Sequence, residues 1–488
     1  MNFAAEVVDA APPDRLALVE LARDGSRREW TFGEVADRSA RLAGTLAARG
    51  VGRGDVVMTV IGNRPEWVLT MLACFRLGAV VLPCTEQLRA KDLRLRIEAA
   101  GPSVVLADER DLGELADAGV PVLSVPDEAL YDSPPAPAAE LDDADPCLIT
   151  FTSGTAGEPK GVLHAQRYLH GQSLQAEHWL APQPGELVWC TAASGWSKSA
   201  RNVFIAPWLR GAAALLHDAR FDPHERLELL AREGVAVLCM APTEYRVIAK
   251  RATLAPLPAL RGMVAAGEAL NPEVLRAFEE VTGLRIRDGY GQTETGQLTG
   301  APAGGETRAG SMGPPLPGVA LEIEDGELTL DPATAPTFFL GYLGEQVARG
   351  EDGAWRVEDR RGSGRWRTGD RVTRDEDGWL YFEGRGDDVI VSAGYRIGPF
   401  EVESALVAHP AVAEAAAVAA PDEERGSVVR AVIVLREGYA PGATLATELQ
   451  EHVKAVTAPY KYPRIVDFAE ELPKTPSGKV KRAELRAG

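Results

Sequence analysis

The stretch VVMTVIGNRPEWVLTMLACFRLGAVVL, residues 56–82, has the pattern strand, helix, strand. Its apolar runs at 56–62 and 79–82 are continuous rather than alternating, and 65–79 between them is long enough for a helix. Continuous apolar runs are typical of strands that are covered on both faces, as in parallel sheets joined by helices. The stretch therefore predicts an α/β fold with mainly parallel strands.

The same pattern continues along the chain and then changes. Further buried strands are expected at 103–106, 148–152, 186–191, 212–217, 235–239 and 262–267, with a helix at 223–233. After about residue 300 Gly and Pro become frequent and short strands follow, which predicts a β-rich subdomain at about 300–386. These segments form a large N-terminal unit, 1–386, and residues 387–488 are expected to form a small α+β unit.

Composition excludes several classes of protein. The 488 residues suggest roughly three structural units. The net charge of −19 repels a phosphate backbone, so we expect no nucleic-acid partner. Five cysteines with no CxxC pair argue against a disulfide scaffold or structural zinc and favour a cytoplasmic location. There is neither a secretory signal nor an apolar run of 18 residues, so no membrane span is expected. The oligomeric state cannot be predicted from the sequence.

A loop rich in Gly and hydroxyl side chains is the first candidate for chemistry. The segment TSGTAGEPKG, 152–161, follows a predicted strand, and we expect a helix to begin near His164. Small residues in such a turn let backbone N–H groups approach phosphate oxygens, and Lys160 adds positive charge. The spacing is not that of a P-loop. A flexible surface loop is the alternative.

Other segments hold polar side chains at turns. GYGQTETG, 289–296, combines a stackable aromatic ring, hydrogen-bond donors and Glu294, which could reach Mg²⁺ beside a triphosphate. Asp370, at the end of RTGD, could accept hydrogen bonds from two vicinal ribose hydroxyls, or it could cap a turn. Lys479 lies in PKTPSGKVKR, 473–482, where a solvated basic tail is the alternative.

Taken together and in this order, these motifs resemble those of the adenylate-forming acyl-CoA synthetases, and most closely the medium-chain acyl-CoA synthetase group. The resemblance rests on TSGTAGEPKG, YGQTE, TGD, PKTPSGK and GRGDDVIVSAGYRIGPFEVE at 384–403, where Ala393 replaces the family's second Ser. The segment HVKAVTAPYKYPR, 452–464, is similar to the medium-chain group almost residue for residue. The resemblance covers nearly the whole chain.

The resemblance implies a nucleotide site in the N-terminal unit, which would be an AMP-binding domain. Lys479, Glu294 and Thr155 would be catalytic, with Glu294 near the metal and Lys479 bridging the carboxylate and the α-phosphate. The residues that would bind ATP or AMP are Thr152, Ser153, Gly154, Thr155, Ala156, Gly157, Glu158, Pro159, Lys160, Asp288, Gly289, Tyr290, Gly291, Gln292, Thr293, Asp370, Arg385 and Lys479.

The resemblance also implies a CoA site and an acyl pocket. Asp387 would be the hinge about which the C-terminal domain rotates between two half-reactions. The residues that would bind CoA are Ala393, Gly394, Tyr395, Arg396, Arg425, Lys454, Tyr462, Pro463 and Arg464. The acyl pocket would include Trp196, Gly267 and Glu268, although Trp196 could equally belong to the core. Lys198 could pair with a polar substrate tail, but we expect it at the surface.

The implied reaction converts a medium-chain fatty or aryl acid, ATP and CoA into acyl-CoA, AMP and pyrophosphate through an acyl-adenylate, with Mg²⁺. A cluster of basic residues in the last unit would attract the anionic CoA; its members are Lys454, Lys461, Arg464, Lys474, Lys479, Lys481 and Arg482. Two alternatives stay open. The acyl group could pass to a carrier-protein thiol or another acceptor, or the chain could be a degenerate nucleotide-binding scaffold without catalysis.

Overall fold

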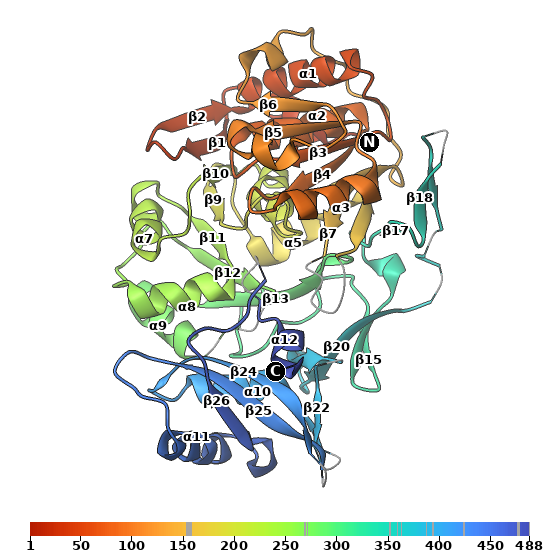
Figure 1. Ribbon diagram of the computed structural model, residues 1–488. Helices are drawn as coiled ribbons and strands as arrows, with labels where there is room; N and C mark the ends of the chain where they lie inside the picture. The colour runs from red at the N-terminus through yellow and green to blue at the C-terminus, as the bar shows by residue number, and fades with distance from the viewer. Residues whose placement is uncertain are drawn as a thin grey trace.

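The computed structural model describes residues 1–152, 159–267, 270, 272–350, 353–358, 360–362, 364–386, 388–392, 395–422, 425–475 and 479–487. Two large sheets form the upper and middle parts of the molecule, a β-rich part lies beside them, and a smaller domain lies below (Figure 1). This is the α/β architecture that the sequence predicts, with mainly parallel sheets and a small α+β domain at the C-terminus.

The quoted stretch folds as strand, helix and strand. β3 (Val56–Val60) pairs in parallel with β4 (Val80–Cys84), and α2 (Pro65–Leu77) joins them. Pro65 suits the first turn of α2, and Gly78 ends the helix in the left-handed conformation, with φ 72°. The sheet has the order β17-β8-β7-β4-β3-β5-β6, and its other strands are β5 (Val104–Asp108), β6 (Val122–Val125), β7 (Pro146–Phe151), β8 (Gly161–Ala165) and β17 (Gly341–Tyr342).

The second large sheet lies next to the first in space and has the order β14-β13-β12-β11-β9-β10-β1-β2. Its strands are β1 (Leu16–Leu21), β2 (Arg27–Thr31), β9 (Leu187–Cys190), β10 (Ala213–His217), β11 (Val237–Met240), β12 (Gly262–Ala266), β13 (Ile286–Gln292) and β14 (Gly296–Gly300). α7 (Pro223–Arg232), α8 (Pro242–Arg251) and α9 (Pro272–Thr282) connect parallel strands of this sheet. The predicted strands are therefore present, because their apolar runs are buried on both faces.

The main core lies between the two sheets and is rich in aromatic side chains. Trp67 of α2 meets Phe204 edge to face, with ring centroids 5.7 Å apart, and both are fully buried. All five cysteines are buried and free. No helix in the described part of the chain is both long and apolar enough to cross a bilayer.

A strand, β8 (Gly161–Ala165), follows the predicted phosphate loop, so the helix that was expected to begin near His164 begins later, at Arg167. β7 and β8 pair antiparallel, with Phe151 opposite Gly161, and His164 is part of β8. The next helix, α4 (Arg167–Gly171), begins only after this strand. The run GVLHA at 161–165 is fully buried between β7 and β17, and pairing on both sides satisfies its backbone as a strand. Hence no helix N-terminus follows the loop directly.

The β-rich part and the C-terminal domain complete the chain. An antiparallel sheet of order β15-β16-β20-β21 contains β15 (Leu321–Glu324), β16 (Glu327–Leu330), β20 (Trp366–Arg374) and β21 (Leu380–Arg385). The C-terminal domain has α10 (Pro399–Val407), β24 (Val412–Asp422), β25 (Gly426–Leu435), α11 (Ala443–Val456), β26 (Ile465–Phe468) and α12 (Arg482–Ala487) around its own apolar core. Asp387 lies outside the described residues, so the boundary at 386/387 stays a prediction.

Candidate active site

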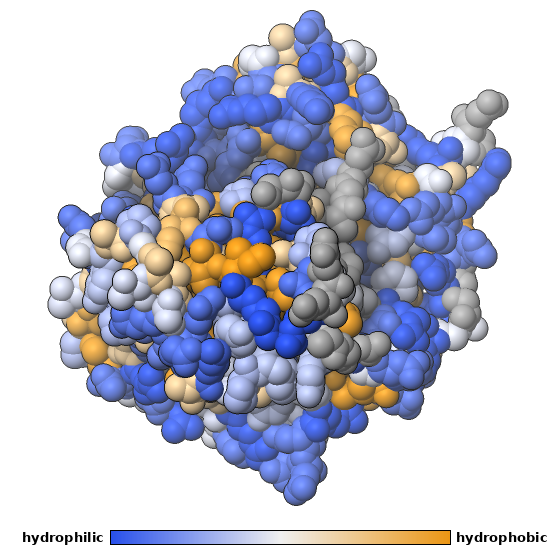
Figure 2. All heavy atoms as spheres, turned by 60° about the horizontal axis from the view of Figure 1, so that its bottom comes forward, coloured by the Kyte–Doolittle hydropathy of each residue, from blue (hydrophilic) through white to orange (hydrophobic). Residues whose placement is uncertain are grey.

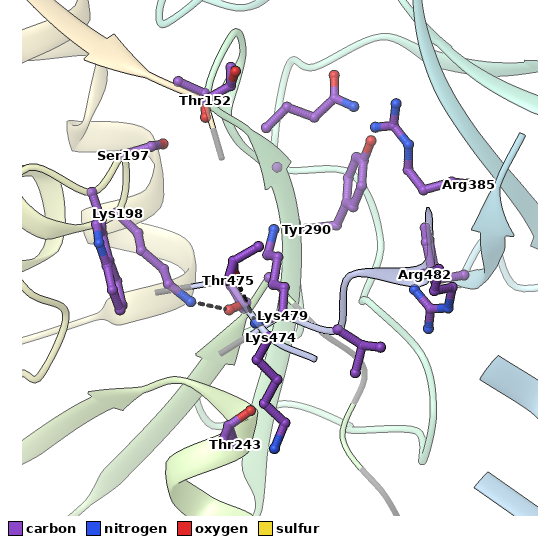
Figure 3. A pocket seen from close by; sticks show the side chains of 18 of the residues that line it. Thr152, Ser197, Lys198, Thr243, Tyr290, Arg385, Lys474, Thr475, Lys479 and Arg482 are labelled. Carbon is purple, nitrogen blue, oxygen red and sulfur yellow. Dashed lines mark hydrogen bonds between the residues drawn. The ribbon is translucent and has the colours of Figure 1, made fainter. Parts of the chain in front are cut away.

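A cavity of about 1550 Å³ opens where the large sheets, the β-rich part and the C-terminal domain meet. Side chains from all of these parts point into it (Figure 3). The molecule has an apolar area at the centre of its lower face, bordered by hydrophilic surface (Figure 2). The predicted site residues that line the cavity are Thr152, Pro159, Lys160, Trp196, Gly267, Asp288, Gly289, Tyr290, Gly291, Gln292, Thr293, Glu294, Asp370, Arg385 and Lys479.

A buried carboxylate, that of Asp370, is held on one wall of the cavity. β20 and β21 place Asp370 directly opposite Arg385, whose guanidinium lies 3.5 Å from the carboxylate. Its other oxygen accepts hydrogen bonds from Tyr290 (2.5 Å) and from Gln292 (2.8 Å). Thr368, rather than Asp370, caps this turn, because its hydroxyl accepts from the Asp370 N–H. The carboxylate is therefore oriented by the side chains that surround it, and it borders the cavity.

The protonation of Asp370 reflects two opposing effects. The residue is only 4% exposed, and this burial raises the pKa of its carboxyl above the ordinary value. The charges of Arg385 and Lys479 and the bonds from Tyr290 and Gln292 act in the opposite direction on that pKa. Asp370 and Lys479 line the same cavity, although they belong to distant parts of the chain.

Lys479 of the C-terminal domain lines the cavity and is hydrogen-bonded to Thr475. The backbone N–H of Thr475 donates to the Lys479 carbonyl over 2.8 Å, and the Lys479 N–H donates to the Thr475 hydroxyl over 3.2 Å. The domain also contacts the large unit, since Arg436 lies 4.0 Å from Glu273 of α9. In this orientation Lys479 enters the cavity, and it is not part of a solvated tail.

The phosphate-loop side of the cavity contains partners that the sequence did not indicate. The Lys160 ammonium lies 2.6 Å from Glu345 and 4.9 Å from the centre of the Tyr342 ring. Tyr342 in turn donates a hydrogen bond of 2.7 Å to Glu294. Tyr342 and Glu345 were missed because they follow a Gly- and Pro-rich stretch with no motif. Ser153, Gly154, Thr155, Ala156, Gly157 and Glu158 lie outside the described residues.

The opposite end of the cavity contains Trp196 and Lys198. Trp196 is partly buried against the core and also lines the cavity, and its place in an acyl pocket stays a prediction. The surface position expected for Lys198 is wrong, because its ammonium points into the cavity and donates to the Ala266 carbonyl over 2.8 Å. The turn after β9 folds closely over the first sheet at Gly195, where a Cβ would lie 2.6 Å from the Thr85 nitrogen. This close approach requires Gly.

Of the two other residues predicted for the acyl pocket, the structure describes Gly267. Gly267 lines the cavity with φ 102°, and a Cβ there would lie 3.0 Å from the Lys198 ammonium. Nearby, burial raises the pKa of Asp288 to about 8, and the positive charge of Lys198 opposes that rise. Glu268 lies outside the described residues.

The residues predicted to bind CoA lie elsewhere. Lys454 and Arg464 approach the Tyr462 ring at 4.2 and 5.1 Å, and Tyr395 stacks on Tyr460 with ring centroids 4.4 Å apart. Together with Arg425 and Pro463, these described residues are on the C-terminal domain and do not line the cavity. Ala393, Gly394 and the side chain of Arg396 are outside what the structure describes. The structure thus brings the predicted nucleotide site together and leaves the predicted CoA site apart from it.

The basic cluster of the C-terminal domain is largely paired with acids rather than bare. The acidic chain supplies a partner within 2.8 Å for most of its members: Lys454–Glu451, Lys461–Glu401, Lys474–Glu414, Lys481–Glu484 and Arg482–Glu403. These pairs, which range from partly buried to exposed, reduce the net positive field. Attraction of an anion to this face would therefore be local.

Comparisons with known proteins agree with this geometry. Residues 5–351 match the family model described as AMP-binding enzyme, and residues 401–479 match its C-terminal domain. The chain is 38% identical to an uncharacterized acyl-CoA ligase, YtcI, of Bacillus subtilis, over 98% of this chain and 94% of that protein. It is also 38% identical to the mitochondrial acyl-coenzyme A synthetase ACSM3 of Rattus norvegicus, over 95% and 85% of the two chains.

Solved structures show the same overall arrangement. A benzoate CoA ligase from Burkholderia xenovorans matches with a TM-score of 0.88 and 27% identity, and each chain is covered completely. An acyl-CoA synthetase from Brucella canis matches with a TM-score of 0.74 and 33% identity, over all of this chain and 94% of the other.

Proposed function

This chain belongs to the AMP-binding enzyme family, and from that premise we propose that it joins a carboxylic acid to CoA with ATP, releasing AMP and pyrophosphate through an acyl-adenylate. The observation that supports this most directly is that Lys479 of the C-terminal domain lines the same cavity as Asp370 and Arg385. Adenylate formation needs a cation in the cavity that holds the nucleotide, because two anions must meet there.

The first half-reaction is the attack of a carboxylate oxygen on the α-phosphorus of ATP, with pyrophosphate as the leaving group. Asp370 and Arg385 bind the ribose hydroxyls, which fixes the α-phosphate relative to the β13 residues Tyr290–Thr293. Lys479 lies between the incoming carboxylate and the α-phosphate and offsets the charge that accumulates on the oxygens. The β- and γ-phosphates bind near Lys160, whose ammonium forms an ion pair with Glu345 in the structure.

Glu294 is the residue that would contact Mg²⁺, which neutralises charge on the phosphates when it is bound. A single carboxylate is a weak site by itself, and no group of three or more potential metal ligands occurs among the described residues. We therefore treat Mg²⁺ as arriving with the triphosphate. The hydrogen bond from Tyr342 holds Glu294 toward the cavity.

The second half-reaction is the attack of the CoA thiol on the adenylate carbonyl, with AMP as the leaving group. The predicted CoA residues lie apart from the cavity in this orientation, so rotation of the C-terminal domain about Asp387 would have to bring them to it. We propose residues 1–386 and 387–488 as the two bodies that move. The extended cavity beside Trp196 and Gly267 favours an aliphatic acid of medium length or an aryl acid.

The experiment is a measurement of both half-reactions. Acid-dependent exchange of pyrophosphate into ATP should occur with a panel of aliphatic and aryl acids, and acyl-CoA should form when CoA is added. Thioester formed only on a holo-carrier protein would favour the alternative acceptor. Nucleotide binding without pyrophosphate exchange for any acid would favour a non-catalytic scaffold and overturn the proposal.

A further inference from the structure

A tryptophan that the reaction described above does not use lies beside the predicted ribose site. Trp366 is the first residue of β20, the strand that carries Asp370, and it lines the cavity. Its indole N–H donates a hydrogen bond of 3.3 Å to the side-chain oxygen of Gln292 on β13. Trp366 therefore contacts a residue that in turn donates to the Asp370 carboxylate.

The amide of Gln292 is fixed in one orientation by its partners. Its Nε2 atom donates to the Thr368 carbonyl and to the Asp370 carboxylate, each over 2.8 Å. Both partners act as acceptors only, because neither a backbone carbonyl nor an ionised carboxylate has a proton to give. On the other side the indole N–H of Trp366 is a donor only, so it has to meet the amide oxygen. The three bonds therefore agree on which end of the amide faces Asp370.

The reversed orientation of the Gln292 amide is unfavourable on both sides. It would place the amide oxygen against the Asp370 carboxylate, so that two acceptors repel each other and the carboxylate loses a donor. Asp370 is only 4% exposed, so water does not easily replace that donor. On the other side the reversed amide would present its NH₂ group to the indole N–H of Trp366, donor against donor. Trp366 thus opposes the reversal that would disturb the carboxylate.

The indole of Trp366 is itself held by packing. Its ring meets those of Phe338 and Phe339 edge to face, with centroids 5.7 and 5.3 Å apart, and both phenylalanines are buried. Aromatic pairs prefer this geometry. The backbone of Trp366 pairs with Leu330 of β16. The direction of the indole N–H is therefore set by the core of the β-rich part.

We propose that Trp366 is a positioning residue for the nucleotide: through the Gln292 amide it orients the Asp370 carboxylate toward the ribose hydroxyls of ATP. This inference rests on the proposed function and adds a residue to its nucleotide site. The Oδ2 atom of Asp370 accepts from both Tyr290 and Gln292, which fixes the plane of the carboxylate. Its Oδ1 atom, 3.5 Å from the Arg385 guanidinium, is then the oxygen that receives the ribose hydroxyls.

The test removes the indole N–H and keeps an aromatic ring. In Trp366→Phe the new ring still packs against Phe338 and Phe339. Binding of ATP to the full-length chain is measured by calorimetry with Mg²⁺ and without acid, and 2′,3′-dideoxy-ATP, which lacks both ribose hydroxyls, is the comparison. We expect the Kd for ATP to rise about two- to tenfold, the range for one neutral hydrogen bond, and the Kd for dideoxy-ATP to stay close to that of wild type.

A double variant shows whether the effect passes through Gln292. Gln292→Met keeps much of the side-chain length and removes the amide. In that background Trp366→Phe should raise the Kd for ATP no further, because the indole N–H has no amide oxygen left to hold. Effects that add fully in the double variant would mean that Trp366 acts by another route, and the inference would be wrong. Trp379→Phe, at a buried position directly before β21 and outside the cavity, is the matched control.

The ratio of the two Kd values is the decisive readout, because a loss of packing alone would weaken both nucleotides equally. Equal rises in Trp366→Phe, or an unchanged Kd for ATP in a variant with the wild-type melting temperature, would overturn the inference. Wild-type protein that binds ATP and dideoxy-ATP equally well would overturn it too. Because calorimetry needs no catalysis, ATP binding with the expected ratio but without pyrophosphate exchange for any acid would contradict the proposed function and support this inference.

Discussion

The Tyr290 hydroxyl donates a hydrogen bond of 2.5 Å to the carboxylate of Asp370, although the two residues belong to different sheets. Tyr290 is on β13, at the edge of the parallel part of its sheet, and Asp370 is on β20 of the antiparallel sheet. Gln292 donates to the same carboxylate oxygen. The bond therefore fixes the β-rich part against the large unit at the point where the nucleotide is expected.

The first prediction concerns this carboxylate. Asp370→Asn removes the negative charge and replaces one carboxylate oxygen by an NH₂ group. An NH₂ group cannot accept a hydrogen bond, whereas Tyr290, Gln292 and Arg385 all present donors to this side chain. We expect the ATP KM of pyrophosphate exchange to rise by about 10-fold or more, because a hydrogen bond to a charged group contributes about 1.5–3 kcal/mol. Tyr290→Phe should give a smaller rise. Asp377→Asn, at an exposed position, is the control, and an unchanged ATP KM in Asp370→Asn would contradict the ribose assignment.

A second prediction follows from the ion pair between Lys160 and Glu345. Both side chains are about half exposed, so the pair contributes roughly 0–1 kcal/mol to stability. The triphosphate has to displace Glu345 from Lys160, so Glu345→Gln should lower the ATP KM by roughly two- to fivefold with little change in melting temperature. Lys160→Ala should raise the ATP KM. A higher ATP KM in Glu345→Gln would show that Glu345 helps to bind the nucleotide instead.

The strands and the order of the site motifs could be predicted because each depends on local sequence. Continuous apolar runs identified β3, β4 and the parallel strands of the second sheet, and the motifs identified Asp370 and Lys479. The strand β8 was not expected, and the helix was placed near His164 instead of at Arg167, because a short buried run such as GVLHA has no periodicity that separates strand from helix.

Tertiary contacts account for the rest of what the sequence did not show. Glu345 meets Lys160 across 185 positions, and no local pattern marks that pair. Lys198 was expected at the surface because lysine usually is exposed, and its hydrogen bond to the Ala266 carbonyl joins positions 68 residues apart, which no local pattern shows.

Chain length of the acid gives a third prediction. Each methylene buried in the cavity contributes about 0.8 kcal/mol, so four additional methylenes that are largely buried favour hexanoate over acetate by about 10²-fold in kcat/KM. The measurement is pyrophosphate exchange with a series from acetate to octanoate. Equal kcat/KM values for acetate and the best longer acid would mean that the end of the cavity near Trp196 does not receive the acyl chain.

The fourth prediction concerns acid stability and His164. Burial lowers the pKa of this imidazole to about 3, helped by the nearby charge of Arg201, whereas an unfolded histidine titrates near 6.5. The contribution of the neutral ring to the free energy of unfolding is therefore complete above about pH 6.5 and is lost as the pH falls toward 3. At full slope the loss is about 1.4 kcal/mol per pH unit.

His164→Gln should remove the contribution of this histidine to the slope of the free energy of unfolding against pH. Urea unfolding between pH 4 and pH 7 would show a flatter dependence in the variant, whatever its stability at neutral pH. His224→Gln, at an exposed position on α7, should keep the wild-type slope. A His164→Gln variant with an unchanged slope would mean that His164 becomes protonated without unfolding.

The last prediction separates the two half-reactions through Lys479. Removing one preorganised group that stabilises charge costs about 10²–10³ in rate, so Lys479→Ala should slow pyrophosphate exchange by at least that factor. Thioester formation from supplied acyl-adenylate and CoA should change far less, because the domain has by then rotated Lys479 out of the cavity. Lys91→Ala removes an exposed lysine outside the cavity and outside the basic cluster, and it should leave both half-reactions near wild type. Equal losses in the two half-reactions of Lys479→Ala would show that this lysine stays in the site throughout, and rotation of the C-terminal domain would then not explain the second step.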